Sequence, residues 1–320
     1  MSKGKKWWLI LAAILTAAGL VIFLGAMAVL DFDFRRLNLM KFETNTYEAE
    51  EAFDRIVIDV DTTEIEFARS DSAQCKIVCI EREREKHTAA VKDGTLTIGT
   101  LDTRKWYDYI GFSFGSPKLT VYLPREKYAS LSVNTHTGDL EIPADFAFEN
   151  LTVSGTTADV NCMASVSDIM NIELTTGDIE ISGITAGALA LSATTGRIEL
   201  SSVTCNGAME VSTTTGGMKL TDVTCQSLTS RGDTGRMILK NVIASDSMSI
   251  ERSTGNVVFE GSDAEQIQVK TSTGHVTGTL LSPKVFVTET GTGRVRVPKT
   301  ASGGKCEITT GTGNIEIDIP

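Results

Sequence analysis

A Thr-Gly pair that recurs every 19 or 20 residues constrains the fold of this chain more than any other feature of its sequence. The series begins at position 137 and continues to position 313, and Thr157-Ala158 fills its one gap. Only a structural repeat produces so regular a spacing. The pairs are Thr137-Gly138, Thr176-Gly177, Thr195-Gly196, Thr215-Gly216, Thr234-Gly235, Thr254-Gly255, Thr273-Gly274, Thr292-Gly293 and Thr312-Gly313.

Positions counted from this pair show the period of a β-strand. The second and fourth residues after the glycine are apolar in nearly every repeat, as in Leu140 and Ile142, and the residue between them is mostly charged or polar. Another pair of apolar columns begins seven residues before the glycine, at Leu131 and its equivalents. Alternation with period two is typical of strands that bury one face. Each repeat therefore predicts two short strands.

A unit this small cannot bury its inward side chains alone, so it must stack on copies of itself. We therefore predict an all-β fold in which residues 131–320 form a parallel β-solenoid of about ten coils. The Thr-Gly column is expected to be structural. Glycine permits the positive φ of a sharp corner, and stacked threonines can pass hydrogen bonds along their ladder.

The amino terminus predicts a membrane anchor. Residues 7–30 contain no charged side chain and are long enough to cross a bilayer as a helix. Lysines precede this stretch and aspartates follow it, so we expect residues 1–6 in the cytoplasm and the remainder outside a single-pass cell membrane protein. A cleavable signal peptide is the alternative, because Ala26-Met27-Ala28 resembles a cleavage site. The apolar stretch is longer than the usual signal core, which favours a retained anchor.

The segment between anchor and repeats is less regular. Residues 31–52 are expected to be a linker, and residues 53–130 a β-rich cap with a divergent first coil. Ile56, Ile58, Val60, Ile65 and Phe67 fit the inward positions of that coil. Residues 70–130 then break the period with a charged run at 81–86, a turn at Asp93-Gly94 and an aromatic stretch. A solenoid end exposes unpaired strand edges, which such a segment can cover.

The strand-like segment 119–124 (LTVYLP), the segment 131–133 and the reiterated unit TTGDIEIS behind one apolar anchor carry a resemblance to a known family. Residues 53–320 resemble the bacterial membrane-anchored "putative adhesin" β-strand-repeat domains, also called toastrack domains. The resemblance implies a domain of unknown biochemical activity, often found with bacterial envelope-stress and membrane-associated systems. It implies no catalytic or ligand-binding residues.

Composition and motifs argue against several functions. The net charge is −11, and three of the lysines precede the anchor, so nucleic acid is not an expected partner. Residues 111–115 match the G-x-S-x-G elbow of serine hydrolases, but the elbow needs a following helix, and a strand pattern follows instead. The three histidines, His87, His136 and His275, are widely separated. We predict no catalytic residues, cofactor or metal.

Asp139, Asp159 and Asp178 occupy equivalent positions in three consecutive coils. Stacked carboxylates repel, and a cation such as Ca²⁺ would relieve the repulsion. The interpretation we favour is a solvated row, partly neutralised by Arg197 in the next coil.

The six cysteines predict few disulfides. Cys75 and Cys79 lie too far apart along one strand to bond, and Cys162 and Cys306 occupy apolar columns. Cys205 and Cys225 lie one coil apart, which is near enough. Their column otherwise holds small residues, so we favour free thiols there.

Three classes of function remain. The favoured one is a non-enzymatic, envelope-anchored binding or scaffolding module with an envelope protein or glycan as partner. A carbohydrate-active enzyme would use Asp139, Glu141, Asp178 and Glu180. An ice-binding solenoid is suggested by Thr-x-Thr at 135/137, 213/215, 271/273, 290/292 and 310/312.

Two surfaces are candidates for contacts. The aromatic cluster of Trp106, Tyr107, Tyr109, Phe112 and Phe114 forms either the core of the cap, which we favour, or an exposed contact. The last coil, residues 305–320, is expected to leave an unpaired edge through which copies of the chain, or a partner strand, associate.

Overall fold

The structure is a computed structural model that describes residues 3–29, 31–32, 42–106 and 115–320. Helix α1 (Lys3–Val29) contains a stretch from Lys6 to Val29 that is long and apolar enough to cross a membrane. The most apolar window of this stretch is not buried against the rest of the protein. An apolar helix whose side chains are mostly exposed is suited to a lipid environment.

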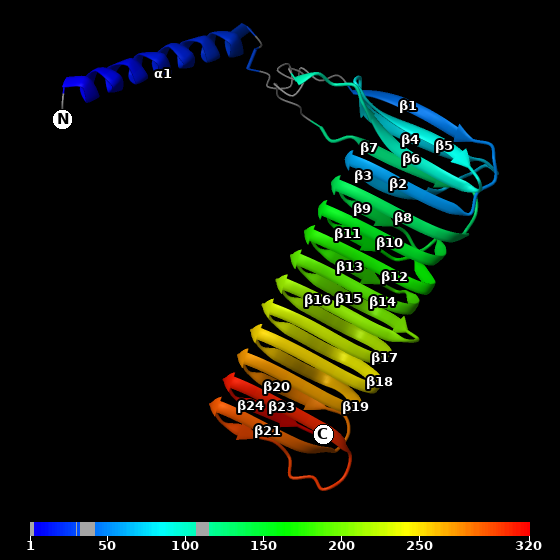
Figure 1. Cartoon of the computed structure of the whole chain (residues 1–320), viewed down its shortest axis with the longest axis vertical. Helices are drawn as coiled ribbons and strands as arrows, with labels where there is room; N and C mark the ends of the chain where they lie inside the picture. Colours follow the sequence, from blue (N-terminus) through cyan, green and yellow to red (C-terminus); the bar gives the residue numbers. More distant parts are fainter. Residues whose placement is uncertain (1–2, 30, 33–41, 107–114) are drawn as a thin grey trace.

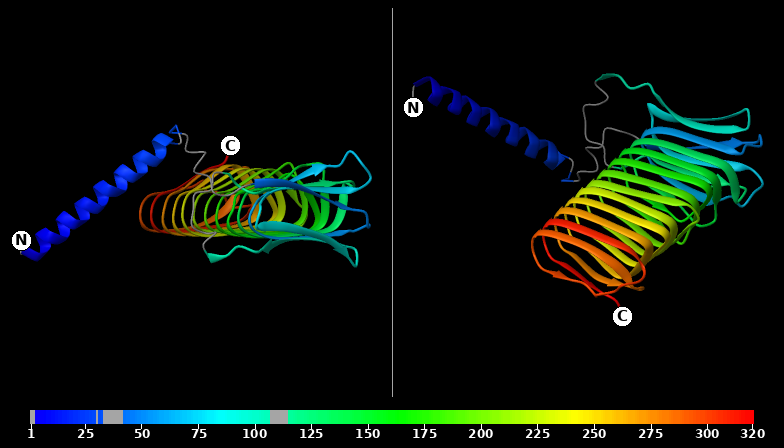
Figure 2. Two further views of the ribbon diagram at one scale, coloured as in Figure 1. Left: turned by 90° about the horizontal axis from the view of Figure 1, so that it is seen from above. Right: turned by 60° about the horizontal axis from the view of Figure 1, so that its bottom comes forward.

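Most of the remaining described chain forms the predicted parallel β-solenoid of about ten coils (Figure 1). Equivalent strands pair in register, so that Leu131 lies beside Leu151 and Leu151 beside Met170. Figure 2 shows the coils as flattened loops stacked along one axis. The coil strands are β2 (Arg55–Thr62), β3 (Glu64–Arg69), β8 (Lys127–Thr137), β9 (Leu140–Ile142), β10 (Ala147–Thr157), β11 (Val160–Cys162), β12 (Ser165–Thr176), β13 (Ile179–Ser182), β14 (Thr185–Thr195), β15 (Ile198–Cys205), β16 (Ala208–Thr215), β17 (Met218–Thr234), β18 (Met237–Thr254), β19 (Val257–Thr273), β20 (Val276–Leu280), β21 (Lys284–Thr292), β22 (Val295–Arg296), β23 (Gly304–Thr312) and β24 (Ile315–Asp318).

The Thr-Gly column stands at a corner where the chain turns from one strand of a coil to the next. Gly235 has a φ of +140°, and a Cβ at this residue would lie 1.9 Å from the carbonyl oxygen of Gly216 in the preceding coil. The backbone conformation and the close approach both exclude a larger side chain. The N–H of Gly235 donates to the carbonyl of Thr254 in the following coil at 2.9 Å. The corner column is therefore also a ladder of backbone hydrogen bonds.

A second corner lies six residues after the corner glycine. Five coils place a residue with φ between +52° and +66° there, namely Gly183, Ser202, Asp222, Asn241 and Gly261. Short polar side chains tolerate this conformation better than other non-glycine residues do. The sequence analysis missed this corner because its residues share a backbone conformation rather than one residue type.

The core consists of the inward columns that the alternation predicts. Leu131, Leu140 and Ile142 are each at most 1% exposed. The five residues assigned to inward positions of the divergent first coil are all buried, namely Ile56, Ile58, Val60, Ile65 and Phe67. One hydrophobic core thus continues from this coil along the stack.

Strands of the cap close the stack at its N-terminal end, where β6 (Thr95–Asp102) and β7 (Lys118–Leu123) pair in parallel with the first coil and the strands beyond them are antiparallel. On one face β6 pairs with β2, and β5 (Glu85–Lys92) pairs with β6. On the other face β7 pairs with β3, followed by β4 (Cys75–Arg82) and β1 (Phe42–Ala49). The expected turn at Asp93-Gly94 joins β5 to β6 with positive φ at both residues.

One boundary of the cap differs from the prediction. Residues 42–49 were expected within the linker, but they form β1, whose partner is β4. The strand is half-buried on alternate residues and carries Glu43, Thr44 and Asn45. Its polar sequence lacks the apolar alternation of the coils, which explains why the period did not identify it.

At the opposite end the coils do not follow the order of the sequence (Figure 1). Strand β23 pairs with β19 on one side and with β21 on the other, and β24 lies in the same way between β20 and β22. Corner hydrogen bonds repeat this order, since Gly274 N–H donates to Thr312 and Gly313 N–H donates to Thr292. The terminal coil is therefore β21 and β22.

The expectation that residues 305–320 form the outer edge is therefore wrong. Every coil carries nearly the same inward pattern, so the pattern identifies a segment as a coil without fixing its place in the stack. The edge that the sequence analysis assigned to residues 305–320 belongs to residues 284–296.

Candidate functional site

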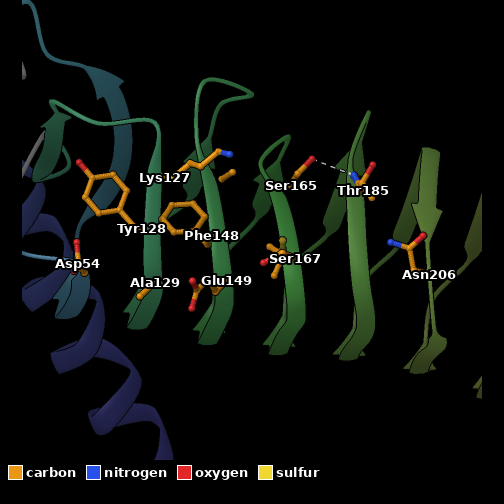
Figure 3. A pocket seen from close by; sticks show the side chains of 12 residues that line it. Asp54, Lys127, Tyr128, Ala129, Phe148, Glu149, Ser165, Ser167, Thr185 and Asn206 are labelled. Atoms are coloured by element: carbon orange, nitrogen blue, oxygen red, sulfur yellow. Dashed lines mark hydrogen bonds between the residues drawn. The ribbon is translucent and has the colours of Figure 1, made fainter.

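A groove of about 660 Å³ crosses successive coils along one side of the stack (Figure 3). We call it the stack groove. Its lining includes the buried side chains of Tyr128, Phe148 and Val166. Four uncharged polar residues also line it: Ser165, Ser167, Thr185 and Asn206. Charged residues, Asp54, Lys127 and Glu149, lie toward the cap. A groove of this size, part apolar and part polar, suits a ligand of several rings or residues.

Aromatic packing fixes the end of the stack groove nearest the cap. The Tyr128 ring stacks on Phe53 with centroids 5.8 Å apart and lies 6.2 Å from the Phe148 ring. The Arg125 guanidinium covers Tyr128 at 4.9 Å from the ring centroid and pairs with Asp54 at 2.7 Å. Burial raises the pKa of Tyr128, so the phenol remains protonated near neutral pH.

The column of side chains beneath the groove narrows away from the cap. Tyr128 pairs with Phe148, and Phe148 with Val166. The next members are Ala186 and Cys205. The side chains of this column therefore become smaller from Tyr128 to Ala186.

A second hollow, of about 500 Å³, gathers acidic side chains on the face made by the short strands that follow the corner. We call it the acidic hollow. It brings together the carboxylates that the sequence analysis singled out, and Lys118 pairs with Glu66 within it at 2.6 Å. Its acidic residues are Glu64, Glu66, Asp139, Glu141, Asp159, Asp178 and Glu180.

The stacked aspartates of the acidic hollow have backbone partners. Asp139 Oδ1 accepts the N–H of Asp159 at 3.0 Å, and Asp159 Oδ1 accepts the N–H of Asp178 at 2.7 Å. Asp178 Oδ1 accepts the N–H of Arg197 at 2.6 Å. Each carboxylate thus satisfies a donor of the next coil, and the repulsion within the row is offset by these bonds. Asn256 Oδ1 makes the same contact with His275 N–H.

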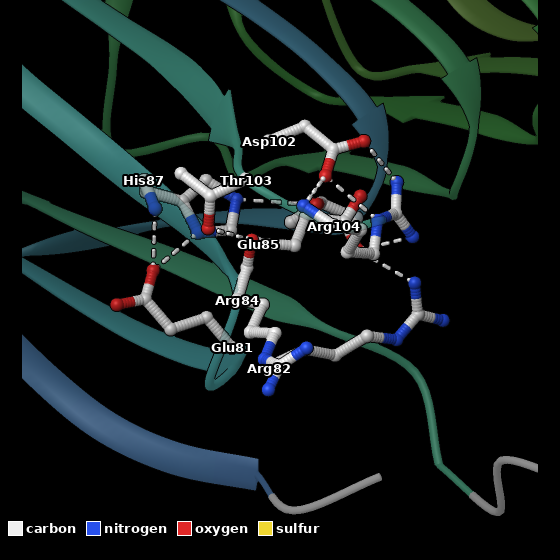
Figure 4. Close-up of polar contacts among 9 residues, drawn as sticks. Glu81, Arg82, Arg84, Glu85, His87, Asp102, Thr103 and Arg104 are labelled. Atoms are coloured by element: carbon white, nitrogen blue, oxygen red, sulfur yellow. Dashed lines mark hydrogen bonds and ion pairs between the residues drawn. The ribbon is translucent and has the colours of Figure 1, made fainter. Parts of the chain in front are cut away.

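The cap contains a buried polar cluster that the sequence analysis missed (Figure 4). Glu81 Oε2 accepts the backbone N–H of His87 at 2.6 Å and lies 2.8 Å from His87 Nδ1. Its Oε1 accepts from Asn45 at 2.6 Å, and His87 Nε2 lies 3.1 Å from Thr63 Oγ1. Glu81 and His87 are almost fully buried. The hairpin between β4 and β5 places the side chain of His87 against that of Glu81, and both side chains are buried.

Cys79, Glu81 and His87 have the ligand types of a metal site, with ligand atoms within 4.8 Å of one another. The contacts do not favour one. Glu81 already accepts bonds on both oxygens, and burial raises the pKa of Cys79 to about 12, which keeps it a thiol. The hydrogen bonds of this cluster stabilise the cap.

A buried ion-pair network extends this cluster along the charged run. The buried carboxylate of Glu85 contacts Arg82 at 2.6 Å and Arg104 at 2.8 Å (Figure 4). Arg104 also pairs with Asp102 at 2.8 Å. Glu81 and Glu85 of the run therefore point inward, and the two arginines neutralise Glu85.

All six cysteines are buried and free. Burial raises the pKa of Cys75, Cys162, Cys225 and Cys306 to about 12. The interpretation of Cys205 and Cys225 as small core residues agrees with their burial, and no disulfide joins them.

Trp106 is 77% exposed, so the preferred placement of this residue in the cap core is wrong. The other members of the aromatic cluster, Tyr107, Tyr109, Phe112 and Phe114, lie outside the described residues. Most of the G-x-S-x-G match does as well. The strand β7 follows it after Pro117, so the helix required by a nucleophile elbow is not there.

The Thr-x-Thr pairs do not form a flat exposed face. Their first threonines point inward, with Thr135, Thr213, Thr271 and Thr310 at most 2% exposed and Thr290 half-buried. Only the second threonine of each pair is exposed. The Thr-x-Thr pattern therefore gives the ice-binding alternative no support.

Comparisons with known proteins found several similar solved structures and one family profile. Similar solved structures include a "putative adhesin" from Bacteroides fragilis, with 18% identity, 86% of this chain and 97% of that chain covered, and a TM-score of 0.44. A "putative adhesin" from Parabacteroides merdae has 13% identity, coverages of 88% and 98%, and a TM-score of 0.46. A "putative lipid binding protein" from Parabacteroides distasonis has 15% identity, coverages of 74% and 94%, and a TM-score of 0.47. The curated proteins include no significant match. The Toastrack DUF4097 family profile matches residues 53–226, and the chain belongs to this family.

Proposed function

We propose that this protein is a non-enzymatic, membrane-anchored extracytoplasmic module that binds a segment of an uncharged envelope glycan in the stack groove. The observation that supports it is the groove itself, which crosses coils from the cap to Asn206 and is lined by Ser165, Ser167 and Thr185. Hydroxyl and amide groups both donate and accept hydrogen bonds, as sugar hydroxyls require. An extended polymer matches a groove that runs along the stack.

Strand pairing favours a glycan over a peptide. Peptides that dock on sheets add a strand to an unpaired edge. The strands beneath the groove have partners on both sides, since β10 lies between β8 and β12, and β12 between β10 and β14. Recognition in this groove therefore depends on side chains. The uncharged middle of the groove favours a neutral ligand over an anionic one.

The anchor supports an extracytoplasmic placement. Lys3, Lys5 and Lys6 precede or begin the apolar stretch, and Asp31 follows it, which is the charge distribution of an N-terminus retained in the cytoplasm. Only residues 30–41 separate α1 from β1 of the cap. The cap therefore lies on the membrane side of the solenoid, and the stack groove begins near it.

The acidic hollow gives less support to catalysis. A glycosidase acid must hold its proton near neutral pH, which requires a shielded environment. Asp139, Glu141, Asp178 and Glu180 are all exposed, and both aspartates accept backbone N–H groups. These carboxylates act as corner acceptors in the fold.

Two tryptophan substitutions in one coil test the proposed site. Thr185→Trp fills the stack groove, whereas Glu180→Trp alters the acidic hollow. Full-length chain in nanodiscs would be titrated calorimetrically with soluble neutral fragments of cell-wall glycan. We expect Thr185→Trp to weaken binding at least about tenfold, which corresponds to about 1.4 kcal/mol, and Glu180→Trp to leave it unchanged. Loss of binding in Glu180→Trp alone, or binding of an extended peptide instead, would contradict the proposal.

A further inference from the structure

Arg252 is a buried cation in the interior of the solenoid. It lies on β18 in the inward column three residues before the corner glycine, and it is 1% exposed. Its ladder neighbours are Gly232 in one coil and Thr271 in the next. The other members of the column are glycine, apolar residues or threonine. Arg252 is therefore the one charged residue in its column.

The Arg252 guanidinium has no acceptor among the described residues. Its Nε, Nη1 and Nη2 atoms are all buried and make no hydrogen bond. Burial lowers the pKa of Arg252 to about 10, so the group still carries its charge at neutral pH. A buried charge without a partner is strongly unfavourable.

Lys284 shows how the same stack accommodates a buried cation. Its Nζ lies 2.7 Å from Asp263 and 2.8 Å from Ser282 Oγ. The buried carboxylates of the described chain, Glu81 and Glu85, belong to the cap. Arg252 therefore has no buried acidic residue near it in the coils.

Arg252 is surrounded by small residues and by few hydrogen-bond acceptors. Its Nη1 lies 1.9 Å from the position that a Cβ of Gly232 would occupy, so the guanidinium extends over a coil that has no side chain there. On the other side the buried Thr271 hydroxyl also has no partner. The equivalent Thr310 and Thr290 hydroxyls donate to the corner carbonyls of neighbouring coils. Adjacent coils thus hold several donors that lack acceptors.

We infer that the solenoid core binds a small monovalent anion, chloride in ordinary solution, between the Arg252 guanidinium and the Thr271 hydroxyl. An anion neutralises the charge of the guanidinium and accepts hydrogen bonds from both residues. A water molecule would accept the same hydrogen bonds but would leave the charge uncompensated. The bound anion links the coils of β17, β18 and β19.

The direct test uses crystals of the full-length chain grown in bromide. An anomalous peak within hydrogen-bond distance of the Arg252 guanidinium is expected. An ordered water in that position, or no peak, would overturn the inference.

Thermal melting gives a second test of the same site. Full-length chain in detergent would be melted in sodium chloride and in sodium gluconate at equal ionic strength. The wild type should melt about 3 °C higher in chloride, and Arg252→Met should differ by less than about 1 °C. Arg231→Met, which removes an exposed arginine of a neighbouring coil, is the matched control and should keep the wild-type response. Thr271→Val should reduce the response while retaining the charge. An equal chloride response in the wild type and Arg252→Met would refute the site.

Discussion

The two ends of the solenoid are finished in different ways. At the cap, β6 and β7 pair with the first coil and antiparallel strands follow them, and the buried groups Glu81, Glu85 and His87 are hydrogen-bonded. At the other end no additional element of the described chain covers β21 and β22, and within it each pairs on one side only. The cap replaces the repeat with a different structure, whereas the distal end uses the repeat out of order.

The two ends also differ in how their strands are connected to the rest of the stack. The strand pairs of β1, β4 and β7 form a continuous series that reaches the coils step by step. The terminal coil reaches them only through β23 and β24, because β21 has no pairing with β19. Loss of one distal coil therefore removes the support of another.

Deletion of residues 304–320 should have the largest effect. Strands β21 and β22 then lose their only partners, so residues 284–296 should lose amide protection along with the deleted coil. Hydrogen exchange with mass spectrometry measures this directly. Deletion of residues 319–320, which lie beyond β24, is the control and should change little. Full protection of residues 284–296 in the longer deletion would show that β21 can move onto β19.

Substitution of an interior corner should have the next largest effect. Gly235→Val introduces a side chain at φ +140° and close to a backbone carbonyl, and should cost more than about 3 kcal/mol. Ser253→Ala removes one exposed hydrogen bond to Asp233 and should cost less than about 0.5 kcal/mol. Denaturant unfolding measures the free energy of unfolding of both variants. Equal losses of this free energy would refute the register of the corner column.

The cap can be weakened through its buried cluster. Glu81→Leu leaves the donors of Asn45 and His87 without an acceptor and should cost about 3 kcal/mol. Glu83→Leu changes an exposed member of the same run and should be nearly neutral. Urea unfolding monitored by circular dichroism measures both. A neutral Glu81→Leu would mean that the cap does not depend on this cluster.

The smallest change in stability is expected at the distal edge. We further propose that copies of the chain associate there, because β21 has an unpaired edge and Val285, Val287 and Val295 are 39%, 50% and 44% exposed. The anchor concentrates copies in one plane. A cysteine in place of Glu289 should crosslink copies in membranes, and Val287→Lys should reduce the crosslinking while changing stability by less than about 0.5 kcal/mol.

A matched position in the middle of the stack controls this experiment. Glu251 is exposed on β18, far from either end of the series of coils. A cysteine there should crosslink little. Equal crosslinking from both positions would indicate random collision rather than association through the edge.

The sequence predicted the features that depend on local pattern. Alternation such as Leu140 and Ile142 identified the coils, and Thr-Gly spacing identified one corner. It did not predict the place of β23, because an inward Cys306 or Ile308 fits any gap between coils equally well. It also missed the buried partner of Glu81, because a charged run is usually solvated and burial depends on contacts from other strands.

The sequence did not predict the stack groove for a related reason. Tyr128, Phe148, Val166 and Ala186 are about one coil apart, and each alone is an ordinary inward residue. The groove crosses the coils on the side where these residues lie one above another. Only the register of the strands places them on one side of the molecule.

The exchanged position of the last two coils affects the order in which the chain can fold as it is synthesised. Ribosomes produce β21 before β23, yet β21 can take its native neighbour only after β23 exists. An emerging chain can form its cap and early coils during synthesis, but residues 284–296 must wait. A partly made chain therefore differs from a finished one in a specific place, an unfilled position beside β19 that proteases or chaperones can recognise.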